Sequence, residues 1–222
     1  MAARKANFEG NPFLGLFARA TDEFVIIPSS AMKKFEEAAV ELAQNVVRAS
    51  VSSSAYVGLY SAANRNGIVL PPFCSGREIE MFEKAGVAVE VLEDTKFCAL
   101  GNNVACNDKG AIVNEEMPRK DVGKIEDALG VEAVPMKIFE YKTVGMMVVA
   151  TNKGFVAHNR ITEEELQQVE SALGVKGLNA TVNCGTAMVG LGIVANSKSA
   201  IIGETSTGFE AGRVEQALEL TD

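Results

Sequence analysis

Residues 57–71 have the sequence VGLYSAANRNGIVLP, in which an apolar stretch, a turn rich in Asn and Gly, and a second apolar stretch follow one another. Asn and Gly tolerate the positive φ angles that tight turns require, so this stretch predicts a β-hairpin. The same order of residue types returns in residues 99–113, ALGNNVACNDKGAIV. A hairpin that returns after about 40 residues indicates a fold built from internal repeats.

A glycine in a small apolar context recurs five times along the chain. These repeat glycines are Gly15, Gly58, Gly101, Gly145 and Gly190, and they are spaced by 43, 43, 44 and 45 residues. Six positions after them come the turn residues Thr21, Asn64, Asn107, Thr151 and Asn196. Three positions later, the middle three units carry Gly67, Gly110 and Gly154. Landmarks that stay in register across nearly the whole chain predict five pseudo-symmetric units in a single domain, residues 1–222.

Each unit is expected to contain a helix after its hairpin. In the last three units, apolar residues lie 21, 24 and 28 positions after the repeat glycine, which matches the helical period. They are Val122, Ile125 and Leu129; Leu166, Val169 and Leu173; and Ala211, Val214 and Leu218. Capping-box pairs and terminating glycines mark the helix ends: Thr162 with Glu165, Thr207 with Glu210, Gly130 and Gly174. A third strand follows, as in residues 87–91 and 176–181, so a unit is predicted to be strand, turn, strand, helix, strand.

The fifth unit lacks its third strand, because the sequence stops at Asp222, where that strand should begin. Counting back from Gly15 by the same offset gives residues 3–8 as the missing strand. We therefore expect an α/β ring that the N-terminal strand closes, with no open sheet edge and with the repeat glycines near the axis. A WD-type propeller has a similar period, but it needs four strands per blade and typically a Trp-Asp signature, and the sequence has no Trp.

The charge balance restricts the kind of partner. The sequence has 21 Lys and Arg residues against 29 Asp and Glu, a formal net charge of −8. Proteins that hold nucleic acid mainly through phosphates need a clustered basic surface, which this sequence does not have. The charge favours a basic protein partner instead.

The apolar segments and the cysteines of the sequence favour a cytosolic protein. No apolar run approaches the roughly 20 residues of a membrane-spanning helix, and the first residues lack the apolar core of a signal peptide. The four cysteines form no C-x-x-C pair, so neither a zinc ribbon nor a disulfide framework is indicated. We therefore expect a cytoplasmic protein with reduced thiols.

Three segments of the sequence, together with the five-fold repeat, resemble a known family. The five-fold ring is similar to the pentein fold. Residues 99–113, residues 148–158 (VVATNKGFVAH) and residues 181–203 (TVNCGTAMVGLGIVANSKSAIIG) resemble the translation initiation factor 6 family, the ribosome anti-association factors of archaea and eukaryotes. The resemblance covers essentially the whole chain, and the absence of a C-terminal tail beyond the fifth helix looks archaeal.

The resemblance implies a non-catalytic monomer without a cofactor or metal. Such a factor binds the intersubunit face of the large ribosomal subunit and sterically blocks the small subunit. In the family the contact is chiefly with a ribosomal protein beside the sarcin–ricin loop, with limited or no direct contact to RNA and none to membranes. An acidic chain without a basic stripe is compatible with that partner.

The resemblance also implies candidate ribosome-binding residues near the repeat glycines. Asn102 matches the family pattern residue for residue, and it follows Gly101 inside the expected first strand, where it has no turn to make. The other candidates are Tyr56, Leu59 and Met188 at corresponding positions, and Asn64 and Asn107 at the hairpin turns. The residue types themselves favour a structural role for the turn asparagines and for the repeat glycines, which permit close backbone approach.

An enzyme and a scaffold remain alternatives. Some penteins modify guanidino groups with a Cys nucleophile and a His acid/base, and Cys184 with His158 is the pair this chain offers. Such chemistry needs an activated thiolate with a base within hydrogen-bond reach. A scaffold that inherited the ring would also lack catalytic residues, and saturable binding to isolated large subunits would distinguish the ribosomal factor from it.

Overall fold

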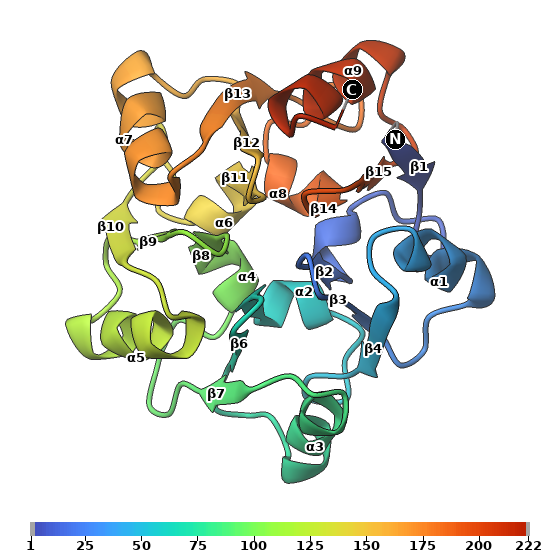
Figure 1. Ribbon diagram of the computed structural model, residues 1–222, viewed down its shortest axis with the longest axis vertical. Coiled ribbons are helices and arrows are strands. Elements are labelled where there is room, and N and C mark those ends of the chain that lie inside the picture. Colours follow the sequence, from blue (N-terminus) through green and yellow to red (C-terminus); the bar gives the residue numbers. More distant parts are fainter. Residues whose placement is uncertain (1–2, 221–222) are drawn as a thin grey trace.

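The computed structural model describes residues 3–220, which form a closed ring of five similar units around a central axis (Figure 1). Each unit contains a one-turn helix, an inner strand, a middle strand, a long helix and an outer strand. The one-turn helices are η1 (Leu14–Leu16), α2 (Val57–Tyr60), α4 (Leu100–Asn103), α6 (Val144–Met147) and α8 (Val189–Gly192). The long helices are α1 (Lys33–Val40), α3 (Gly76–Lys84), α5 (Arg119–Leu129), α7 (Glu163–Leu173) and α9 (Gly208–Ala217).

The strands form five three-stranded sheets within the described residues. The inner strands are β2 (Arg19–Ala20), β5 (Ala62–Asn64), β8 (Val104–Cys106), β11 (Val148–Ala150) and β14 (Ile193–Ala195). The middle strands are β3 (Phe24–Pro28), β6 (Gly67–Leu70), β9 (Ala111–Asn114), β12 (Gly154–His158) and β15 (Ala200–Gly203). The outer strands are β4 (Asn45–Ala49), β7 (Val89–Val91), β10 (Ala133–Met136), β13 (Lys176–Ala180) and β1 (Arg4–Ala6).

Strand pairing follows the same pattern in every unit. The inner strand pairs antiparallel with the middle strand across the hairpin turn, as where Ala105 of β8 lies opposite Ile112 of β9. The outer strand pairs parallel with the middle strand. In the fifth unit the outer strand is β1, in which Lys5 lies opposite Ile202 of β15. The prediction that the N-terminal segment closes the ring is therefore confirmed.

The long helices lie on the outside of the ring, where their apolar sides cover the sheets (Figure 1). The expected helix residues are largely buried: Val122, Ile125, Leu129, Val169, Leu173, Val214 and Leu218. Both expected capping boxes form, and Gly130 and Gly174 end their helices with φ of 63°. The apolar residues of neighbouring units meet in shared clusters, so each unit completes its core only beside the next one.

The repeat glycines lie in one-turn helices, and the expectation that they lie inside the first strand is wrong. A Cβ at Gly101 would lie 2.0 Å from the Gly58 carbonyl oxygen, and a Cβ at Gly145 would lie 2.2 Å from the Gly101 oxygen. The same close approach continues around the ring to Gly190 and Gly15. The five helical turns therefore pack backbone against backbone at the axis, which confirms that glycine is needed there for space.

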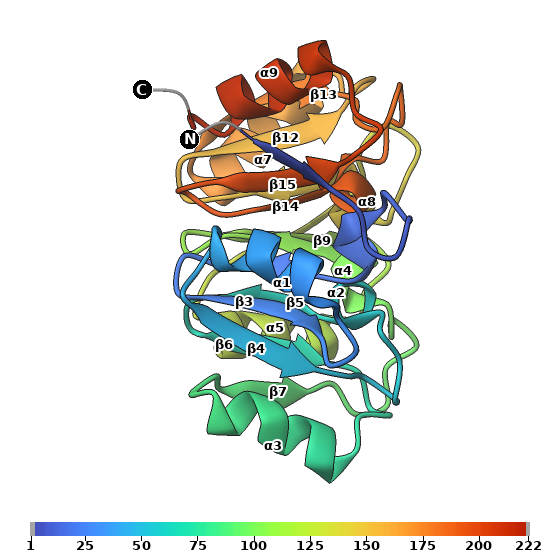
Figure 2. The same cartoon turned by 90° about the vertical axis from the view of Figure 1, so that its right-hand side faces the viewer.

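The ring has two chemically different ends, which Figure 2 separates in side view. The one-turn helices lie at one end, which we call the helix end. The hairpin turns between inner and middle strands lie at the other, which we call the hairpin end. All candidate residues from the sequence fall at one of these two ends or in the loops beside them.

Candidate functional site

Uncharged residues surround the axis at the helix end, forming one surface. It contains the residue that follows each repeat glycine and the residue that caps the start of each one-turn helix, and we call these ten residues the axial face. They are Leu16, Leu59, Asn102, Met146 and Leu191, with Phe13, Tyr56, Ala99, Thr143 and Met188. All ten are partly or well exposed, and most are apolar. Four of the candidates from the sequence, Tyr56, Leu59, Asn102 and Met188, therefore come together on one surface.

Asn102 is the only polar side chain among the five that follow a repeat glycine. It is partly exposed, and its side chain makes no hydrogen bond within residues 3–220. The adjacent Asn103 is buried, donates to the Ala99 carbonyl oxygen at 2.8 Å and accepts from Asn114 at 2.8 Å. The amide of Asn102 is thus available to a partner, whereas that of Asn103 is used by the fold.

Tyr56 supplies the most exposed aromatic ring of the axial face, with 43% of its surface accessible. Its ring stacks on Phe17 at 5.3 Å between centroids, and Phe17 stacks on Phe8 at 4.3 Å. Phe8 in turn packs edge-on against Phe35 of α1. This chain of rings anchors Tyr56 to the core, so the tyrosine is held in one orientation at the surface.

Asn64 and Asn107 lie at the hairpin end, opposite the axial face. Their side chains are only 2% and 5% exposed. The Asn64 amide donates to the carbonyl oxygens of Asn107 and Leu129, and the Asn107 amide donates to those of Thr151 and Leu173. Each asparagine therefore joins its own turn to the turn and the long helix of the next unit, a structural use of the side chain.

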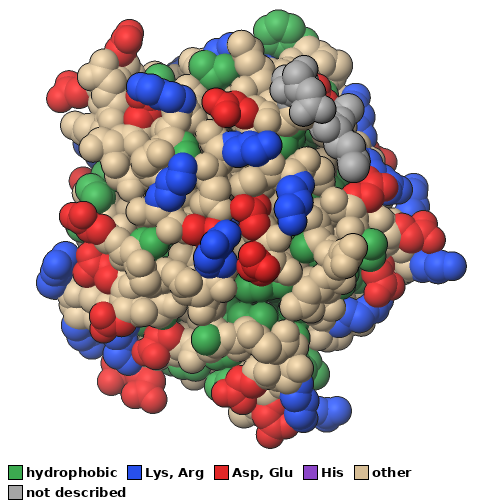
Figure 3. All heavy atoms as spheres, viewed as in Figure 1, with side chains coloured by type: hydrophobic (Ala, Val, Ile, Leu, Met, Phe, Trp, Pro, Cys, Tyr) green, Lys and Arg blue, Asp and Glu red, His purple; other side chains and the backbone are tan. Residues whose placement is uncertain are grey.

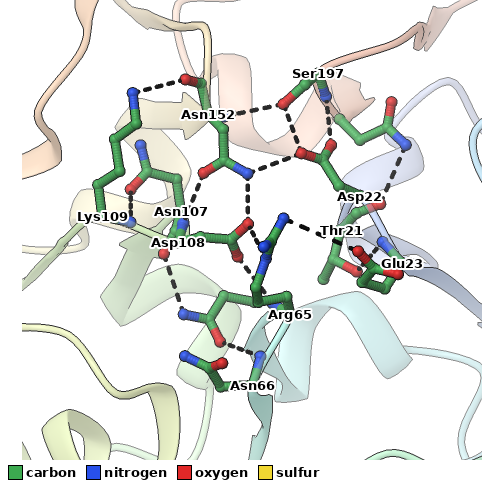
Figure 4. Close-up of polar contacts among 12 residues, drawn as sticks. Thr21, Asp22, Glu23, Arg65, Asn66, Asn107, Asp108, Lys109, Asn152 and Ser197 are labelled. Carbon is green, nitrogen blue, oxygen red and sulfur yellow. Dashed lines mark hydrogen bonds and ion pairs between the residues drawn. The ribbon is translucent and has the colours of Figure 1, made fainter.

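Charged and polar side chains surround the axis at the hairpin end (Figures 3 and 4). Asn152 donates to Asp22 at 2.8 Å and also to Asp108, and the Arg65 Nε donates to Asp108 at 2.8 Å. Burial alone would raise the pKa of Asp22, but hydrogen bonds from Ser197 and Asn152 outweigh it and hold that pKa below its usual value. The two ends of the ring thus differ sharply, since the axial face has no charged residue.

Four carboxylates hold the loops that support the axial face, and the sequence analysis did not identify their shared position. They lie 20 positions after the repeat glycine, at the third residue of the long helix: Glu78, Asp121, Glu165 and Glu210. Glu165 accepts from the Phe139 N–H at 2.8 Å, and Asp121 accepts from the Thr95 hydroxyl at 2.8 Å. The constant offset is the signal that would have revealed them.

Glu210 shows how these carboxylates act. Oε1 accepts from the Gly185 N–H and the Thr181 hydroxyl, both at 2.8 Å, and Oε2 accepts from the Cys184 and Thr207 N–H groups. Burial alone would raise the pKa of Glu210, yet these hydrogen bonds hold it below its usual value. One side chain therefore caps α9 and fixes the loop that leads to Met188.

The structure does not bring Cys184 and His158 together. The Cys184 thiol donates to the Thr205 carbonyl oxygen at 2.9 Å, and the buried His158 ring stacks on Phe139 with centroids 5.7 Å apart. Burial, with a smaller effect from Arg160, lowers the pKa of His158, and no hydrogen bond joins it to Cys184 in the described chain. The thiol–imidazole pair that nucleophilic catalysis requires is not formed.

Among residues 3–220, no group of three or more His, Cys, Asp or Glu side chains is arranged to hold a metal ion. Within the same residues, no helix is both long and apolar enough to cross a membrane.

This chain is similar to several known proteins. The model of the eIF-6 family matches residues 3–217. The translation initiation factor 6 of Pyrococcus furiosus is 43% identical, over 98% of this chain and 99% of the relative. Those of Archaeoglobus fulgidus and Aeropyrum pernix are each 42% identical, over 96% of this chain and 99% and 94% of the relatives. Among solved structures, a dimethylarginine dimethylaminohydrolase is similar with a TM-score of 0.48 and 12% identity, over 94% of this chain and 74% of that one.

Proposed function

This chain belongs to the eIF-6 family, and on that premise we propose that it binds the intersubunit face of the large ribosomal subunit and sterically prevents the small subunit from joining. The observation that carries the proposal is the axial face. A protein with a net charge of −8 presents ten uncharged, mostly apolar residues around its axis, with the anchored ring of Tyr56 among them. Exposed apolar patches of this kind mark interaction surfaces, and aromatic residues are frequent at their energetic centres.

The chemistry of the axial face favours a protein partner. Binding to RNA through phosphates requires Lys or Arg, and none of the ten residues is charged. We propose that the face contacts a ribosomal protein beside the sarcin–ricin loop, with limited or no direct contact to RNA. Asn64 and Asn107 are left out of the proposed surface, because their amides are buried at the opposite end of the ring.

The proposed mechanism is mutual exclusion by a rigid body that acts as a cytoplasmic monomer. A closed ring presents the axial face in one conformation, so little conformational entropy is lost when it binds. No bond is made or broken, and no cofactor is needed. The effect on translation depends only on where the protein sits and how slowly it dissociates.

Co-sedimentation with isolated archaeal ribosomal subunits, followed by a subunit-joining assay, tests this function. We expect stoichiometric binding to the large subunit, none to the small subunit, and suppression of joining at saturating protein. Binding to neither subunit would contradict the proposal. Hydrolysis of a guanidino substrate that is lost in Cys184→Ala would support the enzymatic alternative in its place.

A further inference from the structure

A single arginine interrupts the small, apolar lining of the central axis. Four units have Ala or Val at the equivalent position of the inner strand: Ala62, Ala105, Val149 and Val194. The first unit has Arg19 there. Together with neighbouring inner-strand residues, these five side chains line a hollow of about 30 Å³ on the axis.

The guanidinium of Arg19 has no counter-ion within residues 3–220. Nη2 donates to the carbonyl oxygens of Gly58 at 2.8 Å and Gly101 at 3.4 Å, whereas the fully buried Nε has no partner among the described residues. Burial lowers the pKa of Arg19, because removing the guanidinium from water disfavours its charged form. Arginine nevertheless stays protonated in proteins, and a buried charge without a partner is strongly unfavourable.

No side chain of the hollow supplies the missing negative charge. The other ionisable group there is Cys106, whose thiol donates to the Ala63 carbonyl oxygen. Burial, only partly opposed by Arg19, raises the pKa of Cys106 to about 11, so the thiol is neutral at pH 7. The carboxylates of Asp22 and Asp108 line the adjoining hollow at the hairpin end, where Asn152 donates hydrogen bonds to both (Figure 4).

The inner strands offer further hydrogen-bond donors to the axis. Each of them pairs with its middle strand on one side only, and its other edge faces the centre of the ring (Figure 1). Backbone N–H groups on such edges are available to a ligand. Guanidinium and backbone N–H groups are the donors that proteins use to hold anions.

We propose that the hollow on the axis binds one small monovalent anion of about the size of chloride, with Arg19 as its main ligand. The hollow, about 30 Å³, has room for a small anion beside the guanidinium. The anion neutralises the buried guanidinium, and because it binds only the folded ring, it stabilises the fold. This inference does not depend on ribosome binding.

The direct test is diffraction from crystals in which bromide replaces chloride. An anomalous bromide peak is expected on the axis, within hydrogen-bond reach of the Arg19 guanidinium. Density explained by water alone, with no bromide peak in the hollow, would overturn the proposal.

A thermal test in solution uses sodium chloride and sodium gluconate at a matched ionic strength of about 0.2 M, since gluconate is a much larger anion than chloride. The wild type is expected to melt about 3 °C or more higher in chloride. Arg19→Met should melt at the same temperature in both salts, whereas the surface control Arg48→Met should keep the wild-type difference. If Arg19→Met does not fold, the melting temperatures of the wild type in the two salts and the bromide peak still test whether an anion binds. Equal wild-type melting temperatures in the two salts would refute the proposal.

Discussion

Asn102 and Asn103 are neighbours in sequence but have opposite roles, and this contrast permits a matched test. Asn102→Ser removes an amide that makes no hydrogen bond in the described fold, so we expect its melting temperature to stay within about 1 °C of the wild type. If the amide contacts the large subunit, its loss should weaken binding about ten-fold, as expected for one interfacial hydrogen bond. Thermal melting and co-sedimentation of the same sample measure both effects.

Asn103→Ala provides the control for this pair. Its buried amide bonds Ala99 and Asn114, so its removal should destabilise the fold by about 1–3 kcal/mol. The folded fraction of Asn103→Ala should bind the large subunit with nearly the affinity of the wild type. Unfolding of Asn102→Ser would show that Asn102 has a structural role, and unchanged binding by a folded variant would show that it has no interface role.

Glu210 gives a prediction for the dependence of stability on pH. Its folded pKa lies below the value of 4.5 that it would have unfolded, so its contribution is present above that pH and disappears as the pH falls through the folded pKa. Glu210→Gln should therefore lower the melting temperature at pH 7, by about 4–8 °C for a loss of about 2 kcal/mol. Below the folded pKa the difference from the wild type should shrink.

Melting curves between pH 3 and pH 7 measure this effect, with the exposed Glu164→Gln as the control. Glu164 makes no hydrogen bond or ion pair in the described chain, so its variant should follow the wild type at each pH. A constant difference between Glu210→Gln and the wild type over the whole range would argue against a role for the charged form.

The one-turn helices depend on glycine for close packing, and two glycines of the third unit show the contrast. A methyl group at Gly101 would lie 2.0 Å from the Gly58 carbonyl oxygen of the preceding unit, whereas nothing lies within 4 Å of one at Gly123 in α5. We expect Gly101→Ala to destabilise the fold by about 3 kcal/mol or more. Gly123→Ala should stabilise it by about 0.5–1 kcal/mol, because alanine favours the helix. Chemical denaturation of both variants measures these changes, and equal stabilities would contradict the packing described.

The elements differ in how well the sequence predicted them. Hairpins and long helices were predicted because each has a local signal, namely Asn and Gly at the turn or a 3.6-residue period bounded by caps such as Thr162 and Gly174. The one-turn helices were mistaken for strand, since a helix of four residues such as α2 is too short to show a period. Packing around the axis, a tertiary effect, determines their conformation.

The axial face was predicted only in part, because it too depends on tertiary packing around the axis. Tyr56, Leu59, Asn102 and Met188 were grouped through the resemblance, but their common surface depends on the helical turns. The uncharged character of that surface became visible only when five distant segments were placed side by side. The missing partner of Arg19 is likewise a property of the closed ring and not of any segment.

The whole molecule has five units with the same fold, but the surfaces at its two ends differ in charge. Five units repeat the same backbone, yet the axial face at the helix end has no charged residue, whereas the hairpin end carries acids and bases such as Asp22, Asp108 and Arg65 around the axis (Figures 3 and 4). A charged surface favours solubility, whereas an apolar one favours a stable contact. The central claim is therefore that the ring docks through one end only.

Equilibrium co-sedimentation of two charge variants with purified archaeal large subunits tests this claim most directly. Leu59→Lys places a charge in the axial face, and Lys153→Glu reverses an exposed charge at the hairpin end. We predict that Leu59→Lys weakens binding at least about ten-fold while Lys153→Glu binds within about two-fold of the wild type, with both variants melting like the wild type. Wild-type affinity in Leu59→Lys, with binding lost in Lys153→Glu, would contradict the account.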